Sequence, residues 1–390
     1  MEFQEIQVSE RSAEISRRLE EGLNLVVRGW DGALGMTGLG GRKAPYDDHR
    51  FEFTGGSGDM LRKRHYEKSL RLLWKAEEHA GWSSFHDCSS TERKLLQMAD
   101  DALTKAERSA REELSSDEFR AKLNREYTLE QKEAIVSLLA AVGHGEAYAW
   151  MVSCDVLSMA KSTGARAAFT MQVLEEAKHF VVLRELLHAF DVPIPRQSVW
   201  EYLLLERVHK AEGLDKLFGM NIVVEGIALS LFGMMSNMPG LEILRLFHLD
   251  ESRHSALPVN YLSEFPMTWW QKNSPARRIN RLRLLLPAVP LIAQLEEPAA
   301  RLGIDSLDLG GSVIRKVAFL SERSGFYLPV NMGPLVATFN QLFNIYRRAT
   351  RGDNLNIDYS VAETTLGRVE RRVEEELFGP SPAVSQDLPS

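Results

Sequence analysis

Two isolated acidic residues, each inside a long apolar stretch, constrain the fold of this chain more than any other feature. Glu146 is the only acid within residues 134–154, and Glu225 is the only acid within residues 216–241. A carboxylate buried in such a helix costs free energy unless it is protonated, paired or bound to a metal ion. The two stretches therefore predict buried helices whose glutamates have partners elsewhere in the chain.

Two Glu-x-x-His pairs supply candidate partners, Glu176 with His179 and Glu251 with His254. Residues three apart lie on one face of an α-helix, so both side chains of a pair can reach a single ion. Each pair directly follows another acid. These acids, Glu175 and Asp250, lie where they can accept the second ring N–H of a neighbouring histidine, which fixes the tautomer of a metal ligand.

The same spacing occurs at residues 185–188 and 206–209, and context argues against metal binding at both. The first pair begins nine residues after Glu176, which turns it to the opposite side of the same helix. The second lies among charged residues just before Gly213, as is typical of a solvated helix end. We expect neither pair to bind metal.

The positions of two turns provide an independent test of the ligand set. Helices joined by a short turn place residues level when they are equidistant from that turn. The midpoint between the first isolated glutamate and the first pair falls within residues 161–164, and the second midpoint falls within residues 237–240, which contain Pro and Gly. The spacing thus predicts two helical hairpins and a two-metal site in a four-helix bundle. Its predicted ligands are Glu146, Glu176, His179, Glu225, Glu251 and His254.

We expect an all-α chain in four parts. Residues 1–60 are rich in glycine and predict an arm and loops after one short helix, and residues 61–265 hold the bundle. Residues 266–380 form a C-terminal helical extension packed on it, and residues 381–390 a disordered tail. The core helices are expected at 129–161, 164–190, 214–236 and 240–264.

An additional helix is expected at residues 198–212, between the second and third core helices, so that their connection is a long crossover. Capping-box spacings mark the start of two of these helices, at Thr128 with Gln131 and at Ser198 with Glu201. No convincing strand pattern or internal repeat occurs.

The composition is that of a globular protein with 390 residues, 44% of them hydrophobic, and a net charge of −7. This mild acidity gives no reason to expect a nucleic-acid partner. Two cysteines, Cys88 and Cys154, are too few for a disulfide framework and fit a reducing compartment. Residues 1–17 have no signal-peptide core. We therefore expect a cytoplasmic protein.

An apolar run at residues 284–295 follows several arginines and is too short to span a bilayer. A basic, apolar segment can lie on a membrane surface. We expect this one instead to pack on the bundle or on a dimer partner, in a homodimer.

The strings Glu-Glu-Ala-Lys-His at 175–179 and Asp-Glu-Ser-Arg-His at 250–254 resemble the ferritin-like di-iron oxidase and oxygenase superfamily. The stretch from Tyr66 to Trp82 is similar to the helix before the bundle in its larger members, and the resemblance covers about residues 60–265. It implies a ferritin-like four-helix bundle with a long crossover and additional N- and C-terminal helices. Members include arylamine N-oxygenases, acyl-carrier desaturases and oxidases related to ribonucleotide reductase radical subunits.

The resemblance also implies a reaction. Two iron ions, or manganese with iron, would activate O2 for hydroxylation or N-oxygenation of a small-molecule or carrier-bound organic substrate, with electrons from a reductase. Either Glu176 with Glu251 or the two isolated glutamates would bridge the metals. N-oxygenases carry an extra histidine ligand where this chain has Phe247, and the adjacent His248 would reach the site after a small helix distortion, or be hydrogen-bonded near the core.

Large apolar residues on the expected inner face are candidates for a substrate channel, although each is also a suitable core residue. They are Trp150, Phe180, Phe232 and Met235.

Two other functions use the same bundle. One is a ferroxidase or other metal-redox protein, and the other is a non-catalytic helical bundle. Metal content separates the non-catalytic bundle from the rest, and substrate-dependent O2 consumption separates an oxygenase from a ferroxidase.

Overall fold

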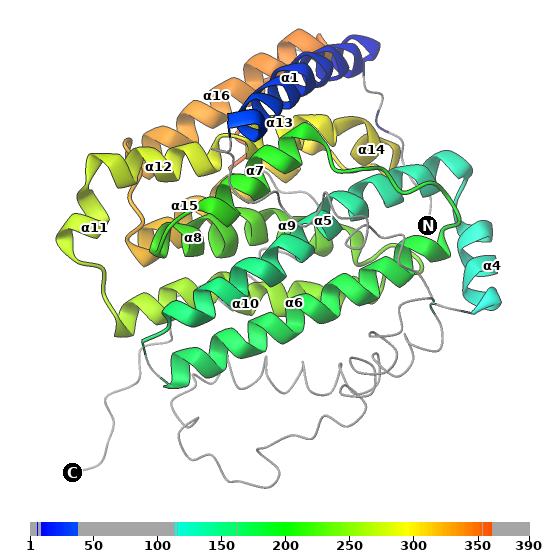
Figure 1. Ribbon diagram of the computed structural model, residues 1–390. Coiled ribbons are helices and arrows are strands. Elements are labelled where there is room, and N and C mark those ends of the chain that lie inside the picture. The colour runs from blue at the N-terminus through cyan, green and yellow to red at the C-terminus, as the bar shows by residue number, and fades with distance from the viewer. Residues whose placement is uncertain are drawn as a thin grey trace, which may run out of the picture.

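Every regular element in the described part of the protein is a helix, as expected (Figure 1). The computed structural model describes residues 6, 9–37, 114, 116–161, 163–352 and 354–360. The stretch from Tyr66 to Trp82 and the expected tail at 381–390 lie outside these residues. In chain order the helices are α1 (Glu10–Thr37), α4 (Asp117–Glu126), α5 (Leu129–Met159), α6 (Thr163–Ala189), α7 (Val199–Lys210), α8 (Leu214–Leu217), the π-helix η6 (Phe218–Val224), α9 (Glu225–Met235), α10 (Leu244–Glu264), α11 (Trp269–Asn273), α12 (Pro275–Leu285), α13 (Ala288–Gln294), α14 (Glu296–Arg301), α15 (Ser306–Ser324) and α16 (Met332–Arg351).

Four central segments pack around a common interior. They are α5, α6, the continuous α8–η6–α9 segment and α10, and their ends lie close to the expected ranges. Helix α5 packs against α6 and α9, and α10 packs against the same two helices. The short α5–α6 and α9–α10 connections make two hairpins that lie side by side (Figure 1).

Both predicted capping boxes are present and set the starts of α5 and α7. The Thr128 and Ser198 side chains accept hydrogen bonds from the backbone N–H groups of Gln131 and Glu201, whose side chains bond back to the capping residues. Each cap satisfies backbone donors that a helix start leaves without partners and stabilises the helix by about 1 kcal/mol. Helix α7 lies in the connection between α6 and α8, as expected for a crossover.

The π-helix η6 is a feature that the sequence did not predict. It occupies Phe218–Val224, where every side chain is buried, and ends directly before Glu225. Such widened turns inside α-helices occur frequently at functional sites.

The N-terminal region differs from the expected short helix and loops, because α1 runs for 28 residues. It has few buried side chains, and ion pairs such as Arg17–Glu21, at 3.0 Å, support it along its exposed face. At its buried end the Ser12 hydroxyl donates to Glu296 at 2.5 Å, and Tyr346 of α16 donates to the same carboxylate. The start of α1 is thus attached to the C-terminal helices.

The apolar run at 284–295 packs on the central helices. Leu284, Leu285, Leu291 and Leu295 are buried in the common core. Two segments, 129–159 and 214–235, are long and apolar enough to cross a membrane, but most of each is buried inside the protein. Their apolar character is explained by their position as core helices.

A buried arginine attaches α11 and α12 to the start of the third central segment. Arg281 is 1% exposed, and its Nε donates to Asp215 Oδ1 at 3.0 Å. Its Nη1 donates to the Tyr327 carbonyl at 3.1 Å and its Nη2 to the Gln271 carbonyl at 2.6 Å. One guanidinium therefore joins three segments that are far apart in the sequence.

Replacing Arg281 with leucine is expected to lower the free energy of unfolding by about 3 kcal/mol, because it leaves the buried Asp215 carboxylate without its main charged partner. Urea denaturation measures this loss. Arg283→Leu, at an exposed position of the same helix, serves as the control. If both substitutions lower the free energy of unfolding by the same small amount, Arg281 does not hold these segments together.

Candidate metal centre

The four central segments bring all six predicted ligand residues to one buried point. Helix α5 contributes Glu146, α6 contributes Glu176 and His179, the first turn of α9 contributes Glu225, and α10 contributes the remaining pair. None is more than 2% exposed. We call these six residues the candidate metal centre: Glu146, Glu176, His179, Glu225, Glu251 and His254.

The centre consists of two overlapping ligand sets. In each set, one potential ligand atom per residue lies within 4.8 Å of all the others. The first set contains Glu146 and His179, the second contains Glu225 and His254, and both contain Glu176 and Glu251. The sequence left open which carboxylates are shared, and the geometry favours the two from the Glu-x-x-His pairs.

Both imidazole rings face the carboxylates through Nδ1. Nδ1 of His179 lies 2.9 Å from Glu251 Oε1 and 3.2 Å from Glu146 Oε2. Nδ1 of His254 lies 3.1 Å from Glu176 Oε1 and 3.2 Å from Glu251 Oε2. Glu251 therefore lies between the two rings.

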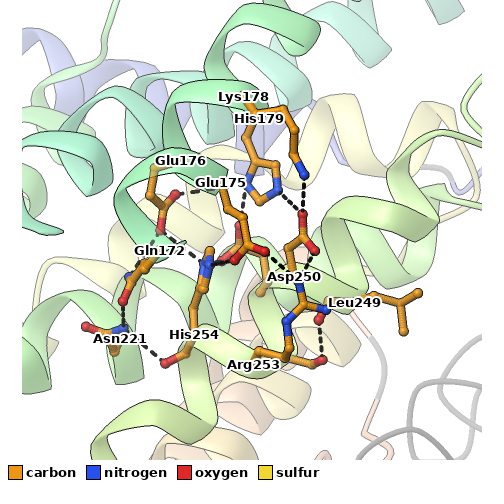
Figure 2. A network of polar contacts seen from close by, with 12 residues as sticks. Gln172, Glu175, Glu176, Lys178, His179, Asn221, Leu249, Asp250, Arg253 and His254 are labelled. Atoms are coloured by element: carbon orange, nitrogen blue, oxygen red, sulfur yellow. Dashed lines mark hydrogen bonds and ion pairs between the residues drawn. The ribbon is translucent and has the colours of Figure 1, made fainter. Parts of the chain in front are cut away.

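The opposite nitrogen of each ring contacts an acid from the facing helix. His179 Nε2 lies 2.9 Å from Asp250 Oδ2, and His254 Nε2 lies 2.9 Å from Glu175 Oε2 (Figure 2). Because an ionised carboxylate only accepts hydrogen bonds, Nε2 carries a proton and donates in each pair. In a neutral ring this leaves the Nδ1 lone pair directed into the centre, as metal ligation requires. The acid before each pair thus orients the histidine of the other pair.

Arg253 joins these two outer acids. Its Nη2 donates to Glu175 Oε1 at 2.7 Å and also to Asp250 Oδ1 (Figure 2). Lys178 adds a second positive charge 3.3 Å from Asp250 Oδ2. Although burial alone would raise the pKa of Asp250, its hydrogen bond from His179 and these two cations hold that pKa below the ordinary value. The outer acids therefore remain ionised.

Gln172 and Asn221 extend the network on the other side. Gln172 Nε2 donates to Glu176 Oε1 at 3.1 Å. Asn221 Nδ2 donates to Gln172 Oε1 and to the His254 carbonyl, both at 3.0 Å (Figure 2). Asn221 lies in the π-helix η6, so this irregular turn helps to position the centre. A polar residue inside the apolar run 216–241 was the available signal for it.

The four glutamates of the centre are only partly hydrogen-bonded. One oxygen of each of the four accepts no hydrogen bond in the part of the chain that the structure describes. For Glu251 this is Oε1, which lies 2.9 Å from His179 Nδ1 without hydrogen-bond geometry. A buried polar atom without a partner needs an explanation, and four carboxylate oxygens that converge on one point are explained by a bound cation. The four atoms are Glu146 Oε1, Glu176 Oε2, Glu225 Oε1 and Glu251 Oε1.

The electrostatics of the centre also call for a cation. Burial, followed by the charges of neighbouring glutamates, raises the pKa of Glu146 and of Glu225 well above the ordinary value. Burial would lower the pKa of His179 and His254, but the surrounding carboxylates raise it well above the ordinary value. The metal-free centre therefore favours protonation of these glutamates and histidines. A bound metal ion would supply the positive charge that these protons provide.

The structure does not bring His248 to the centre. Its Nδ1 lies 2.9 Å from the Leu229 carbonyl of α9, and His248 belongs to neither ligand set. This is the alternative, hydrogen-bonded position. The neighbouring Phe247 stacks on the His179 ring, with centroids 4.3 Å apart.

A largely apolar cavity adjoins the centre beside Glu146 and Glu225. None of the four channel candidates lines it. Phe232 and Met235 are fully buried in the core, and Phe180 is 7% exposed. Trp150 is half-buried and also lies outside the cavity. The large side chains fill space, while smaller residues leave the cavity open.

Comparisons with family models, curated proteins and solved structures return no match to this chain.

Proposed function

We propose that this protein is a ferritin-like, non-haem di-iron oxygenase or oxidase that uses O2 to oxidise a small organic substrate. The observation that carries the proposal is the pair of overlapping ligand sets, built from buried carboxylates with an unpartnered oxygen each and from histidines held by the acids of the facing helix. The packing of the four central segments and the crossover helix α7 support a ferritin-like bundle.

The donor atoms favour iron or manganese. Carboxylate and imidazole suit Fe(II) and Mn(II), whereas thiolates typify structural zinc and iron–sulfur sites, and Cys154 is exposed and belongs to neither ligand set. Glu146 and His179 would hold one ion and Glu225 and His254 the other. Glu176 and Glu251 would contact both.

Bound iron would supply electrons to O2. Insertion of one oxygen atom of O2 into a C–H or N–H bond takes two electrons from the substrate and two from a reductant, consumes two protons and releases the other oxygen atom as water. An electron-donor protein, which restores the electrons given by iron, is therefore part of the proposal. The protein's own residues hold the imidazoles in one tautomer and neutralise the outer acids through Arg253. The apolar cavity beside the centre excludes water from the reacting groups.

Anaerobic loading with Fe(II), followed by O2 consumption measurements, tests this function. An oxygenase is expected to continue consuming O2 while a reductant and an oxidisable substrate are both present. With Fe(II) alone its O2 consumption should stop. A ferroxidase would continue while excess Fe(II) lasts. His254→Ala removes a residue of the candidate metal centre. Its matched control is His188→Ala, which removes an exposed histidine with the same Glu-x-x-His spacing. Absence of bound iron in the wild type would refute the proposal.

A further inference from the structure

We infer that the substrate presents an uncharged aliphatic segment to the centre, in a pocket whose outer wall is formed by α7 and α13. This inference rests on the proposed function and assigns the chemical class of its substrate. The cavity beside Glu146 and Glu225 carries it.

Small residues on α5 create the space. Ala141, Gly145 and Ala149 lie at every fourth position and line the same cavity, as residues on one face of a helix do. A Cβ atom added at Gly145 would have a single neighbour within 4 Å, Val224 Cγ1 at 3.7 Å. The missing side chain therefore leaves open volume rather than allowing close backbone packing.

The remaining walls come from different parts of the chain. Helix α9 contributes Ala228 and Leu231, and the crossover helix α7 contributes Leu204 and Leu205. Leu291 of α13 closes the cavity from the C-terminal extension. The extension is therefore part of the pocket, which gives this segment a role in substrate selection.

The cavity reaches both ligand sets. Glu146 belongs to one set and Glu225 to the other, and both line the cavity. Each is at most 2% exposed and has one oxygen without a hydrogen-bond partner among the described residues. A molecule in the cavity would therefore lie directly beside both metal positions.

The charges around the cavity disfavour an anionic group inside it. Its polar lining residues are three glutamates, and no Lys, Arg or His is among the described residues that line it. The third glutamate, Glu201, is 6% exposed, and its Oε2 is already bonded by His144 Nδ1 at 2.9 Å and the Ser198 N–H at 3.1 Å. A carboxylate or phosphate would be buried without a charged protein partner, and the four glutamates of the centre already balance the charge of two Fe(II) ions, so burying the anion is costly.

The composition of the lining disfavours an aromatic ring. Aromatic ligands gain from stacking or edge contacts with aromatic side chains, and none of the described lining residues is aromatic. The nearby aromatic residues pack elsewhere: Phe247 stacks on His179, and Phe232 meets Phe247 edge-on at 5.3 Å. The aliphatic lining therefore suits an alkyl segment.

Calorimetric titration of anaerobic, iron-loaded protein with 1-hexanol, 1-octanol, 1-decanol, octanoate and p-toluidine tests the inference. We expect one octanol per chain, with octanoate and p-toluidine binding at least about tenfold more weakly. Gly145→Ala adds a methyl group inside the pocket and should weaken octanol binding by about tenfold, the typical effect of one methylene. Gly333→Ala, at an exposed position on α16, is the matched control.

A second variant changes the pocket in the opposite direction. Leu291→Ala should enlarge it and shift the preferred alcohol from octanol toward decanol. Leu320→Ala, which empties a buried position outside the pocket, should leave the preference unchanged. Tighter binding of octanoate or p-toluidine than octanol, or unchanged octanol affinity in Gly145→Ala, would overturn the inference.

Iron content measured on the same samples separates the two proposals. Two bound irons with no binding of any alcohol would refute the aliphatic pocket and leave the proposed function standing. Protein that binds no iron would refute the proposed function, and the substrate inference would fall with it.

Discussion

Replacing Glu251 with alanine is expected to abolish binding of both metal ions, whereas replacing Glu146 with alanine should leave about one ion per chain. The difference follows from geometry, because Glu251 belongs to both ligand sets and Glu146 to only one. Metal quantification after anaerobic loading and removal of excess metal measures it. Glu225→Ala and His254→Ala should each lower bound metal without unfolding the protein.

Circular dichroism checks that these variants remain folded, and His188→Ala should retain the full metal content because it lies outside the centre. Identical stoichiometry in Glu146→Ala and Glu251→Ala would show that the two sets do not share ligands. Full occupancy in both Glu225→Ala and His254→Ala would show that the ligands have been misidentified.

Removing the metal ions is expected to lower the melting temperature by roughly 10–20 °C. An ion present at about 100 times its dissociation constant stabilises the folded state by about 2.7 kcal/mol, so two ions contribute about 5 kcal/mol. In domains of about 150–250 residues each kcal/mol corresponds to about 2–4 °C. Calorimetry before and after treatment with a chelator measures the shift.

The Glu225→Gln substitution should have opposite effects on the stability of the metal-free and the metal-bound protein. Glu225→Gln removes a buried carboxylate that faces other acids, so it should stabilise the metal-free protein. In the metal-bound protein it should be destabilising, because an amide is a weaker ligand. A melting temperature that is insensitive to the chelator, or a Glu225→Gln variant that is less stable in both states, would contradict a metal site here.

The central helices were predictable because their signals are local. The turns at 161–164 and 237–240 and the capping residues Thr128 and Ser198 determine where helices begin and end. The six residues of the centre could be named because an acid in an apolar helix needs a partner, and the two pairs had the right spacing. The pairs at 185–188 and 206–209 lie in neither ligand set. The second is not a solvated helix end as expected, because Glu206 is buried and accepts a hydrogen bond from Tyr148 at 3.3 Å.

The relations between helices could not be predicted in the same way. The sequence suggested that Glu175 and Asp250 support histidines but not that each serves the ring on the other helix. Arg253, which lies 78 residues from Glu175 in the chain, bonds to it only because α6 and α10 pack together. The position of Asn221 depends on a π-helix, which has no reliable sequence pattern.

The cavity and α1 were missed for a different reason. The sequence pattern of apolar residues is the same whether a side chain fills the core, as that of Phe232 does, or lines a cavity, as that of Leu205 does. Gly145 was the better signal in the sequence, because the cavity lies where this residue has no side chain. Helix α1 has an apolar stripe that includes Ile15, Leu19 and Leu23, a helical spacing that the expectation of loops overlooked, and pairs such as Glu14 with Arg18 also support it.

Anomalous diffraction at the iron edge, from crystals loaded anaerobically with Fe(II), shows directly whether the centre holds two iron ions. We expect two iron peaks per chain, both within coordination range of Glu176 and Glu251, with His179 beside one and His254 beside the other. A single peak, an iron-free centre, or zinc in place of iron with no reaction toward O2 would contradict this expectation.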